Sequence, residues 1–196
     1  ENAGAQIGVV TSVQGLRWLD VIVTGRDSHA GTTPLDARSD ALLAAGAILV
    51  ALRRVGLDAG IDARVSVARL STATDGPSTI VGQADLVIDI RHPDANVLAG
   101  LAKTCAEACR SAATEYDCTA EVSERFAVPP RQFDQDCVDL VENAAQELQL
   151  SYLKLPSGAL HDAANIAPLA PTAMIFVPCR DGISHNILEY AAPEDL

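Results

Sequence analysis

The sequence predicts an α+β protein built in two parts. Residues 12–126 are expected to form a ferredoxin-like domain, in which a split βαβ arrangement gives an antiparallel sheet with two helices on one face. Three observations predict it: the order of segments is strand, helix, strand, strand, helix, strand; the strands alternate apolar and polar residues; and Pro129-Pro130 follows the last strand. Residues 127–196 are expected to be an α/β segment, because their last strand is apolar throughout.

Alternation of apolar and polar residues predicts strands at 7–13, 16–24, 63–73, 83–92 and 119–128, with a tight connection at Gln14-Gly15 between the first two. One helix is expected at 38–55 and is expected to end at Gly56, and a second is expected from Asp94, its cap, to Glu115. Apolar residues surround most of the first helix. One of its faces should therefore pack on the sheet, while another should be covered by a further surface such as a second subunit.

The second part is expected to contain an amphipathic helix at 134–150, a short strand at 152–154 and a helix that opens within 157–164. The apolar strand at 172–177 should be buried on both faces, so it needs neighbouring strands that this chain supplies only in part. The chain begins Glu1-Asn2 without Met and ends at Pro193 and two acids, which resemble a helix start. We therefore expect an internal piece of a longer protein.

Composition argues against several classes of partner. The formal net charge of −12 disfavours nucleic acid and anionic membranes, since both are polyanions. No apolar run approaches the roughly 20 residues that a membrane helix needs. The five cysteines show no metal-ligand spacing, so reduced, mostly buried thiols in a cytoplasmic protein are expected and structural zinc is not.

A loop of small and hydroxylated residues surrounds His29, between the strand at 16–24 and the following helix. Gly31 and Pro34 fix an irregular backbone there, and the neighbouring threonines can bond it locally. Such a loop holds an imidazole out from a rigid scaffold, which is how loops present functional groups. The local sequence equally allows a solvated histidine in a polar connection.

Arg91 stands at the end of the strand at 83–92. A guanidinium binds a carboxylate through two parallel hydrogen bonds, which suits a substrate resembling an amino acid. The alternative is a salt bridge within the chain, to Asp89 or Asp94. His92 beside it is expected to be structural.

Two further histidines lie in the second part. His185 follows the apolar strand, in the kind of loop where α/β sheets place ligands, and a surface histidine is the alternative. His161 and Asp162 stand at a predicted helix start, where they could line a pocket or simply support the helix N-terminus.

Three separated stretches resemble one family. They are Ser-His-Ala-Gly-Thr-Thr-Pro at 28–34, Asp-Ile-Arg-His-Pro at 89–93, and Gly-Ile-Ser-His-Asn at 182–186 with Glu189. Their order is similar to that in dinuclear-metal amidohydrolases related to aminoacylases and carboxypeptidases. The branch of closest resemblance comprises N-carbamoyl-L-amino-acid hydrolases, β-ureidopropionases and allantoate amidohydrolases. The resemblance implies that 12–126 is a lid, or dimerisation, domain, and that 1–11 and 127–196 belong to an incomplete catalytic domain whose first part would precede Glu1.

The resemblance also implies roles for individual residues. The implied site consists of catalytic His29, substrate-binding Arg91, His161 and Ser78, and metal-binding His185. His29 would stabilise a tetrahedral oxyanion, and Arg91 would anchor a substrate carboxylate across a dimer interface. The family usually has Asn where Ser78 stands and Gly where Leu160 stands, which implies either altered specificity or lost activity.

The implied reaction is metal-assisted attack of water on a linear amide or N-carbamoyl carbon next to a carboxylate, with Zn, Mn, Co or Ni as the divalent ion. Only His185 resembles a ligand, so the isolated chain is expected to be inactive and without a dinuclear centre. The expected partners are a second copy, through the lid domain, and a small carboxylate-bearing substrate. Two alternatives stay open: a carboxypeptidase or aminoacylase relative with the same lid, and a non-catalytic dimerisation module.

Overall fold

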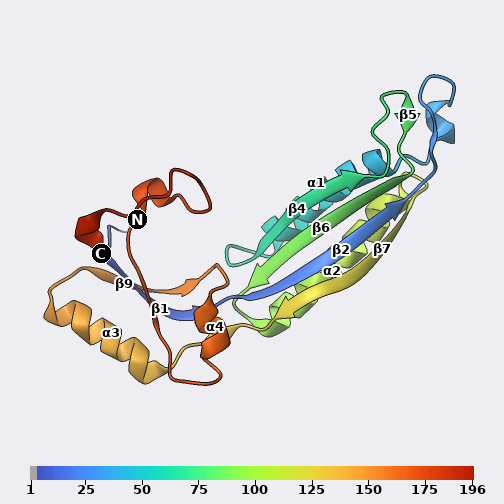
Figure 1. Ribbon diagram of the computed structural model, residues 1–196. Coiled ribbons are helices and arrows are strands. Elements are labelled where there is room, and N and C mark those ends of the chain that lie inside the picture. Colours follow the sequence, from blue (N-terminus) through green and yellow to red (C-terminus); the bar gives the residue numbers. More distant parts are fainter. Residues whose placement is uncertain (1–3) are drawn as a thin grey trace. The chain divides into compact units, whose positions relative to one another are not determined.

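A computed structural model describes residues 4–196 and divides the chain into two compact units (Figure 1). One unit is Gly15–Pro129, and the other combines the N-terminal residues up to Gln14 with Pro130–Leu196. The sequence predicts that this first domain spans residues 12–126. The chain start at Glu1-Asn2, used above to predict a piece of a longer protein, lies outside the described residues.

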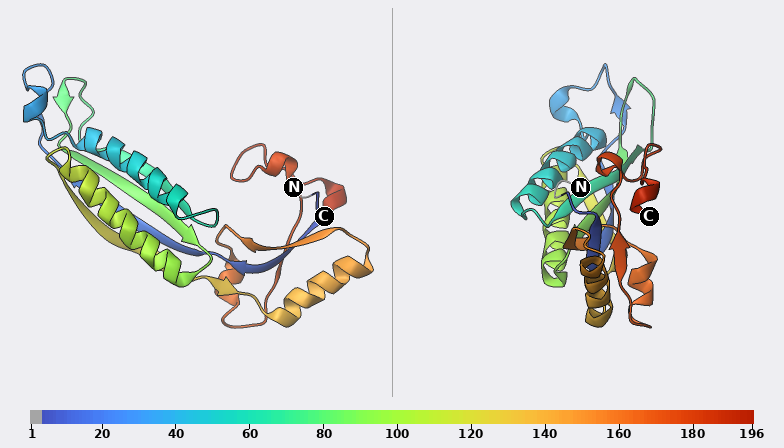
Figure 2. Two further views of the ribbon diagram at one scale, coloured as in Figure 1. Left: turned by 180° about the vertical axis from the view of Figure 1, so that it is seen from behind. Right: turned by 90° about the vertical axis from the view of Figure 1, so that its left-hand side faces the viewer.

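The unit Gly15–Pro129 contains an antiparallel sheet in the order β4-β6-β2-β7. Its strands are β2 (Gly15–Thr24), β4 (Arg64–Thr72), β6 (Gln83–His92) and β7 (Thr119–Val128). The helices α1 (Ala41–Asp58) and α2 (Ala95–Thr114) lie side by side on one face of this sheet (Figure 2). This is the split βαβ order of ferredoxin-like domains, so the predicted antiparallel sheet with two helices on one face is confirmed.

The core of this unit lies between the sheet and the two helices. Alternate residues of the central strands are buried there, as the period of two requires: Leu19, Val21 and Val23 from β2, and Ala84, Leu86, Ile88 and Ile90 from β6. Cys105 and Cys109 of α2 join them, and burial raises the pKa of each thiol to about 12. These two cysteines therefore act as small apolar residues, as predicted.

The limits of α2 are confirmed, because Asp94 Oδ1 accepts hydrogen bonds from the amides of Asn96 and Val97 and so caps the helix. The predicted start of α1 at Arg38 is wrong. A separate 3₁₀ turn occupies Leu35–Ala37, and α1 begins only after Asp40, whose carboxylate caps it.

The predicted end of α1 at Gly56 is also wrong, since the helix continues to Asp58. Gly56 instead permits a close approach of helix and sheet: a Cβ at this position would lie 3.3 Å from the Cβ of Val65 in β4. The helix ends at Asp58, and Gly60, two residues beyond that end, has a φ of +95°. Packing, rather than helix termination, accounts for Gly56.

The second unit is organised around β1 (Ile7–Val13). This strand pairs in parallel with β9 (Tyr152–Ser157) and antiparallel with β10 (Met174–Phe176) and β8 (Arg131–Gln132). The helices of the unit are α3 (Gln135–Glu147) and the short α4 (Asp162–Ile166). A small core contains Val9, Val10, Val13, Phe133, Val138 and Ala164. Since β1 and β2 belong to different sheets, the connection at Gln14 is not a hairpin.

Three predictions for this unit need correction. The strand β10 is shorter than expected and is not buried on both faces, since it pairs only with β1 within the described residues and Ile175 is 56% exposed. The strand β9 is longer than expected and continues to Ser157, while α4 begins at Asp162, within the predicted 157–164. The helix α3 ends at Glu147, because Gln149 adopts a φ of +57° and leaves the helical conformation. No helix within residues 4–196 is both long and apolar enough to cross a membrane.

Candidate functional site

The His29 loop is joined to a second loop by a two-stranded sheet. The strand β3 (Ser28–His29) pairs with β5 (Thr79–Ile80), and the amide of Ala30 donates to the carbonyl of Ser78 at 2.8 Å. His29 and Ser78, which are far apart in sequence, therefore lie beside each other at one end of the unit. Both side chains are exposed to solvent there.

The ring of His29 is oriented by its own loop. Its Nδ1 atom accepts a hydrogen bond of 3.0 Å from the amide of Gly31, so the neutral imidazole carries its proton on Nε2. Gly31 permits this arrangement, since a Cβ there would lie 3.2 Å from the ring. The loop thus presents an N–H donor rather than a proton acceptor. That form of histidine suits hydrogen bonding to a developing oxyanion.

Charged side chains brace this loop from within. The guanidinium of Arg38 donates to the carbonyl oxygens of Ala30 (2.7 Å) and Thr33 (3.0 Å), on the two sides of the turn. On its other flank, Asp27 accepts a hydrogen bond from the amide of Gly82. Sequence reasoning missed both braces, because the partners of Arg38 and Asp27 are backbone carbonyl and amide groups, which leave no side-chain pattern to recognise.

Arg91 forms a bidentate ion pair with Asp89. The Nε and Nη2 atoms of Arg91 each lie 2.8 Å from an oxygen of Asp89, and both side chains are largely buried. The predicted alternative of an ion pair with Asp89 is therefore confirmed, while Asp94 instead caps α2. His92 is structural as predicted: it is buried, and its Nδ1 accepts from the amide of Asp94.

Trp18 also contacts the ion pair of Arg91 and Asp89. Trp18 Nε1 donates to Oδ2 of Asp89 at 2.9 Å, and the Trp18 ring packs 5.5 Å from that of Phe126. Burial acts to raise the pKa of Asp89, but the hydrogen bonds from Arg91 and Trp18 outweigh it, so this pKa lies below its ordinary value. The hydrogen bond to Asp89 raises the pKa of Arg91. Sequence reasoning did not identify Trp18.

His29 and Arg91 lie at opposite ends of the same unit. The pairing of β2 with β6 runs from Thr24 opposite Gln83, beside the His29 loop, to Leu16 opposite Arg91. At about 3.3 Å per residue, the strand from Gln83 to Arg91 spans about 26 Å. That length exceeds a small amino-acid derivative, so one copy of this unit does not bring His29 and Arg91 onto the same substrate.

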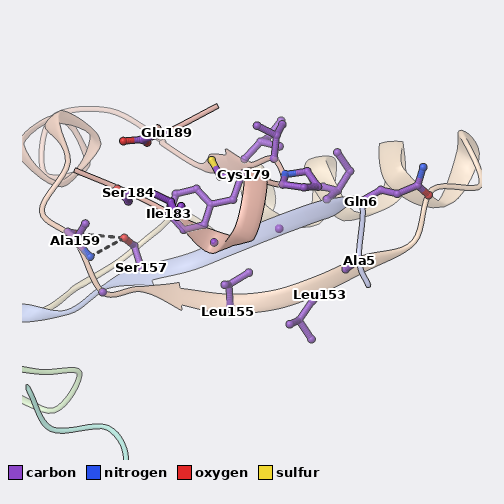
Figure 3. Close-up of a pocket in the computed structure, with 18 of the residues that line it drawn as sticks. Ala5, Gln6, Leu153, Leu155, Ser157, Ala159, Cys179, Ile183, Ser184 and Glu189 are labelled. Atoms are coloured by element: carbon purple, nitrogen blue, oxygen red, sulfur yellow. Dashed lines mark hydrogen bonds between the residues drawn. The ribbon is translucent and has the colours of Figure 1, made fainter. Parts of the chain in front are cut away.

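The second unit contains a pocket of about 540 Å³, lined by β1, β9, β10 and the loop after β10 (Figure 3). His161 lines it, with Nε2 at 2.8 Å from the hydroxyl of Ser157 and its ring 5.7 Å from that of Phe176. Ser157 is almost completely buried and also contacts Ala159, so it fixes the imidazole. His161 precedes α4, but its side chain does not cap the helix.

His185 lies in the loop beyond this pocket. Its side chain is exposed, its φ is +55°, and its amide donates to the carboxylate of Glu189 at 2.9 Å. Among residues 4–196, no three or more His, Cys, Asp or Glu side chains are grouped so that they could hold a metal ion. The described residues therefore do not fit a dinuclear metal centre by themselves, although His185 could contribute one ligand to such a centre.

The comparisons with known proteins agree with the motifs. The chain belongs to peptidase family M20/M25/M40, which it matches over residues 2–196. It is 38% identical to an N-carbamoyl-L-amino-acid amidohydrolase of Rhizobium meliloti, over 96% of this chain and 45% of that protein. It is 30% identical to the allantoate amidohydrolase of Escherichia coli strain K12, over 100% of this chain and 48% of that protein. The predicted family resemblance is confirmed.

Solved structures agree in fold. A hydantoinase/carbamoylase family amidase from Burkholderia vietnamiensis superposes with a TM-score of 0.94 at 37% identity, over 99% of this chain and 47% of that one. An amidase of the same family from Burkholderia multivorans gives a TM-score of 0.90, also over 47% of its chain. The chain thus spans about half the length of the relatives that it matches.

Proposed function

We propose that this chain forms the lid domain and part of the catalytic domain of an amidohydrolase that cleaves a linear amide or N-carbamoyl bond next to a carboxylate. The observation that carries the proposal is the orientation of His29, whose Nε2–H donor is fixed by the Gly31 amide at the tip of a braced loop. The names of the relatives, which are amidohydrolases of N-carbamoyl-L-amino acids and of allantoate, support this substrate class over a peptide substrate or a non-catalytic module.

Each site residue has a separate task in this proposal. Arg91 binds the substrate carboxylate, which is why a charged group beside the scissile bond is required. His29 donates a hydrogen bond to the oxygen that gains negative charge as water attacks the carbon. Ser78 contacts the substrate beside His29, and His161, fixed by Ser157, lines the pocket.

The separation of His29 and Arg91 favours a site shared between two copies. One copy would supply His29 and Ser78, and the other would supply Arg91, because about 26 Å of strand divides them within a single unit. A two-fold arrangement would build two such sites at once. Homodimerisation is thus part of the proposed mechanism.

The surface formed by α1 and the edge strand β4, here called the α1–β4 surface, is the proposed dimer interface. Exposed apolar residues lie along α1 at helical spacing: Leu42, Leu43, Leu49, Val50 and Leu57. The exposed side of α2 is mainly polar by contrast, with ion pairing between Lys103 and Glu107. Within residues 4–196, β4 is an edge strand, so the backbone groups on its outer side can also bond a second strand.

A divalent metal, Zn, Mn, Co or Ni, is proposed for the full-length protein, with His185 as one ligand. Because the described residues do not complete such a site, its remaining ligands would come from outside residues 4–196. A cytoplasmic location is proposed as well, since all five cysteines are free thiols.

The test is an assay of the full-length protein against paired substrates. The assay would compare four substrates: an N-carbamoyl-L-amino acid, its methyl ester, the matching N-acetyl amino acid and the matching dipeptide. Each would be measured after chelation and again after addition of each metal. We expect metal-dependent hydrolysis of the N-carbamoyl acid and much slower hydrolysis of the ester. Preferred cleavage of the dipeptide would favour the peptidase alternative, and no turnover with any metal would favour the non-catalytic one.

A further inference from the structure

The ion pair of Arg91 with Asp89 forms within one strand of the sheet. The two residues stand two apart on β6, so their side chains project from the same face of one strand. The residue directly opposite Arg91 on β4 is Arg64, and the one opposite on β2 is Leu16. Neither cross-strand neighbour can neutralise the guanidinium. Asp89, which lies beside it on the same strand, carries the opposite charge and pairs with it.

Two contacts fix Asp89 in turn. Both of its oxygens accept from Arg91, and one of them also accepts from the indole nitrogen of Trp18, which stands directly opposite on β2. Phe126 packs against the Trp18 ring from the next strand. Asp89 thus accepts a hydrogen bond from Trp18 on β2 and binds the Nε and Nη2 atoms of Arg91 on β6.

This arrangement has a consequence for the orientation of Arg91. A long, flexible arginine loses side-chain entropy when it binds a carboxylate, and a guanidinium already fixed in place loses less. The contacts of Nε and Nη2 with Asp89 restrict the orientations that the guanidinium of Arg91 can adopt. Since Asp89 is itself an anion, its contact also sets how strongly the guanidinium attracts a second carboxylate.

We propose that Asp89, held by Trp18, is a positioning residue that orients the guanidinium of Arg91 for recognition of the substrate carboxylate. The proposal rests on the carboxylate-binding role given to Arg91 in the proposed function. Asp89 touches no reacting atom and acts only through Arg91. Its effect should therefore be confined to substrates that carry a free carboxylate.

The test compares Asp89→Asn with a matched variant of the same sheet. Asp20 forms an equivalent ion pair with Arg125, through Nε at 2.9 Å and Nη2 at 2.7 Å, so Asp20→Asn removes the same kind of contact away from Arg91. Both variants would be made in the full-length protein, and kcat and KM measured for an N-carbamoyl-L-amino acid and for its methyl ester. Arg91→Lys and the double variant Asp89→Asn with Arg91→Lys complete the set.

We expect Asp89→Asn to raise KM for the acid about ten-fold, with a much smaller change in kcat, because a charged hydrogen-bond partner of Arg91 is lost. The kinetics of the ester should be unchanged, as should those of Asp20→Asn with either substrate. In the Arg91→Lys background, Asp89→Asn should have little further effect. Asp89→Glu, which restores the charge, should recover part of the loss.

The possible failures are distinguishable. If Arg91→Lys weakens use of the acid while Asp89→Asn behaves like Asp20→Asn, the positioning role is wrong and the proposed function stands. If Arg91→Lys changes neither substrate, the carboxylate role of Arg91 fails and the positioning role fails with it. Should Asp89→Asn not fold, Trp18→Phe removes the hydrogen bond to Asp89 while keeping an aromatic ring beside Phe126. This variant should raise KM for the acid alone, and an unchanged KM would overturn the proposal.

Discussion

Gly82 and Asp27 are packed so closely that no side chain fits between them. The amide of Gly82 donates to Oδ1 of Asp27 at 2.9 Å, and a Cβ on Gly82 would lie 2.6 Å from the amide nitrogen of Asp27. This contact joins the start of the His29 loop to the start of β6. The position of His29 therefore depends on a glycine that is distant in sequence.

Gly82→Ala should destabilise the chain by about 1–3 kcal/mol, because the added methyl group must displace backbone rather than a flexible side chain. Urea unfolding of the variant and the parent would measure the loss. Gly100→Ala is the control: this exposed glycine lies within α2 with no atom near its would-be Cβ, and alanine should stabilise the helix by up to about 1 kcal/mol. Equal stability of Gly82→Ala and the parent would contradict the packing described.

His29→Ala in the full-length protein should lower kcat roughly 100-fold to 1,000-fold with a smaller change in KM, as expected for a lost donor to an oxyanion. His29→Gln keeps an N–H donor and should retain more activity than alanine. Steady-state kinetics on an N-carbamoyl amino acid would measure both. A loss confined to KM would assign His29 to substrate binding instead.

Arg91→Lys should reduce kcat/KM for carboxylate substrates by about 2 kcal/mol or more, roughly 30-fold, since a bidentate contact becomes a single one. Arg125→Lys is the matched control, because Arg125 makes a similar bidentate pair with Asp20 on the same sheet. Unchanged kinetics of Arg91→Lys would remove Arg91 from the site.

Val50→Lys should dissociate the proposed dimer. Val50 is 72% exposed on α1, and a charge at the centre of an apolar interface must be desolvated without a partner. Val97→Lys places the same charge on the exposed side of α2 and should leave the dimer intact. Sedimentation at roughly tens of micromolar, a concentration suited to an interface of standard size, would distinguish the two. A parent chain that is monomeric at this concentration would refute the α1–β4 surface as an interface.

The 196-residue chain alone should neither hydrolyse N-carbamoyl amino acids nor retain two metal ions. A two-metal centre needs several histidine and carboxylate ligands to keep its ions about 3.5–4 Å apart, and His185 is the one histidine here that resembles a ligand. Elemental analysis after gel filtration would measure the bound metal, and adventitious binding should be weak. Turnover, or two ions held tightly per chain, would contradict this prediction.

Local patterns determined much of the first unit. Alternation along β2 and β6 fixed which residues face the helices, because side chains of a strand point to opposite faces in turn. Asp94 marked the start of α2, since a carboxylate before a helical stretch satisfies free amides. The motifs around His29, Arg91 and His185 identified the family from sequence alone.

Other features depended on contacts between distant segments, which no local pattern encodes. Glycine often ends a helix, but α1 continues past Gly56, where the absence of a side chain allows close packing against Val65. The apolar run around Ile175 predicted a strand buried on both faces. Within the described residues this strand pairs with β1, and the side chain of Ile175 is 56% exposed. Arg91 was a candidate site residue from its motif. Only the sheet decided that Asp89 and Trp18 hold it, and that His29 lies at the far end, because strand register determines which side chains meet.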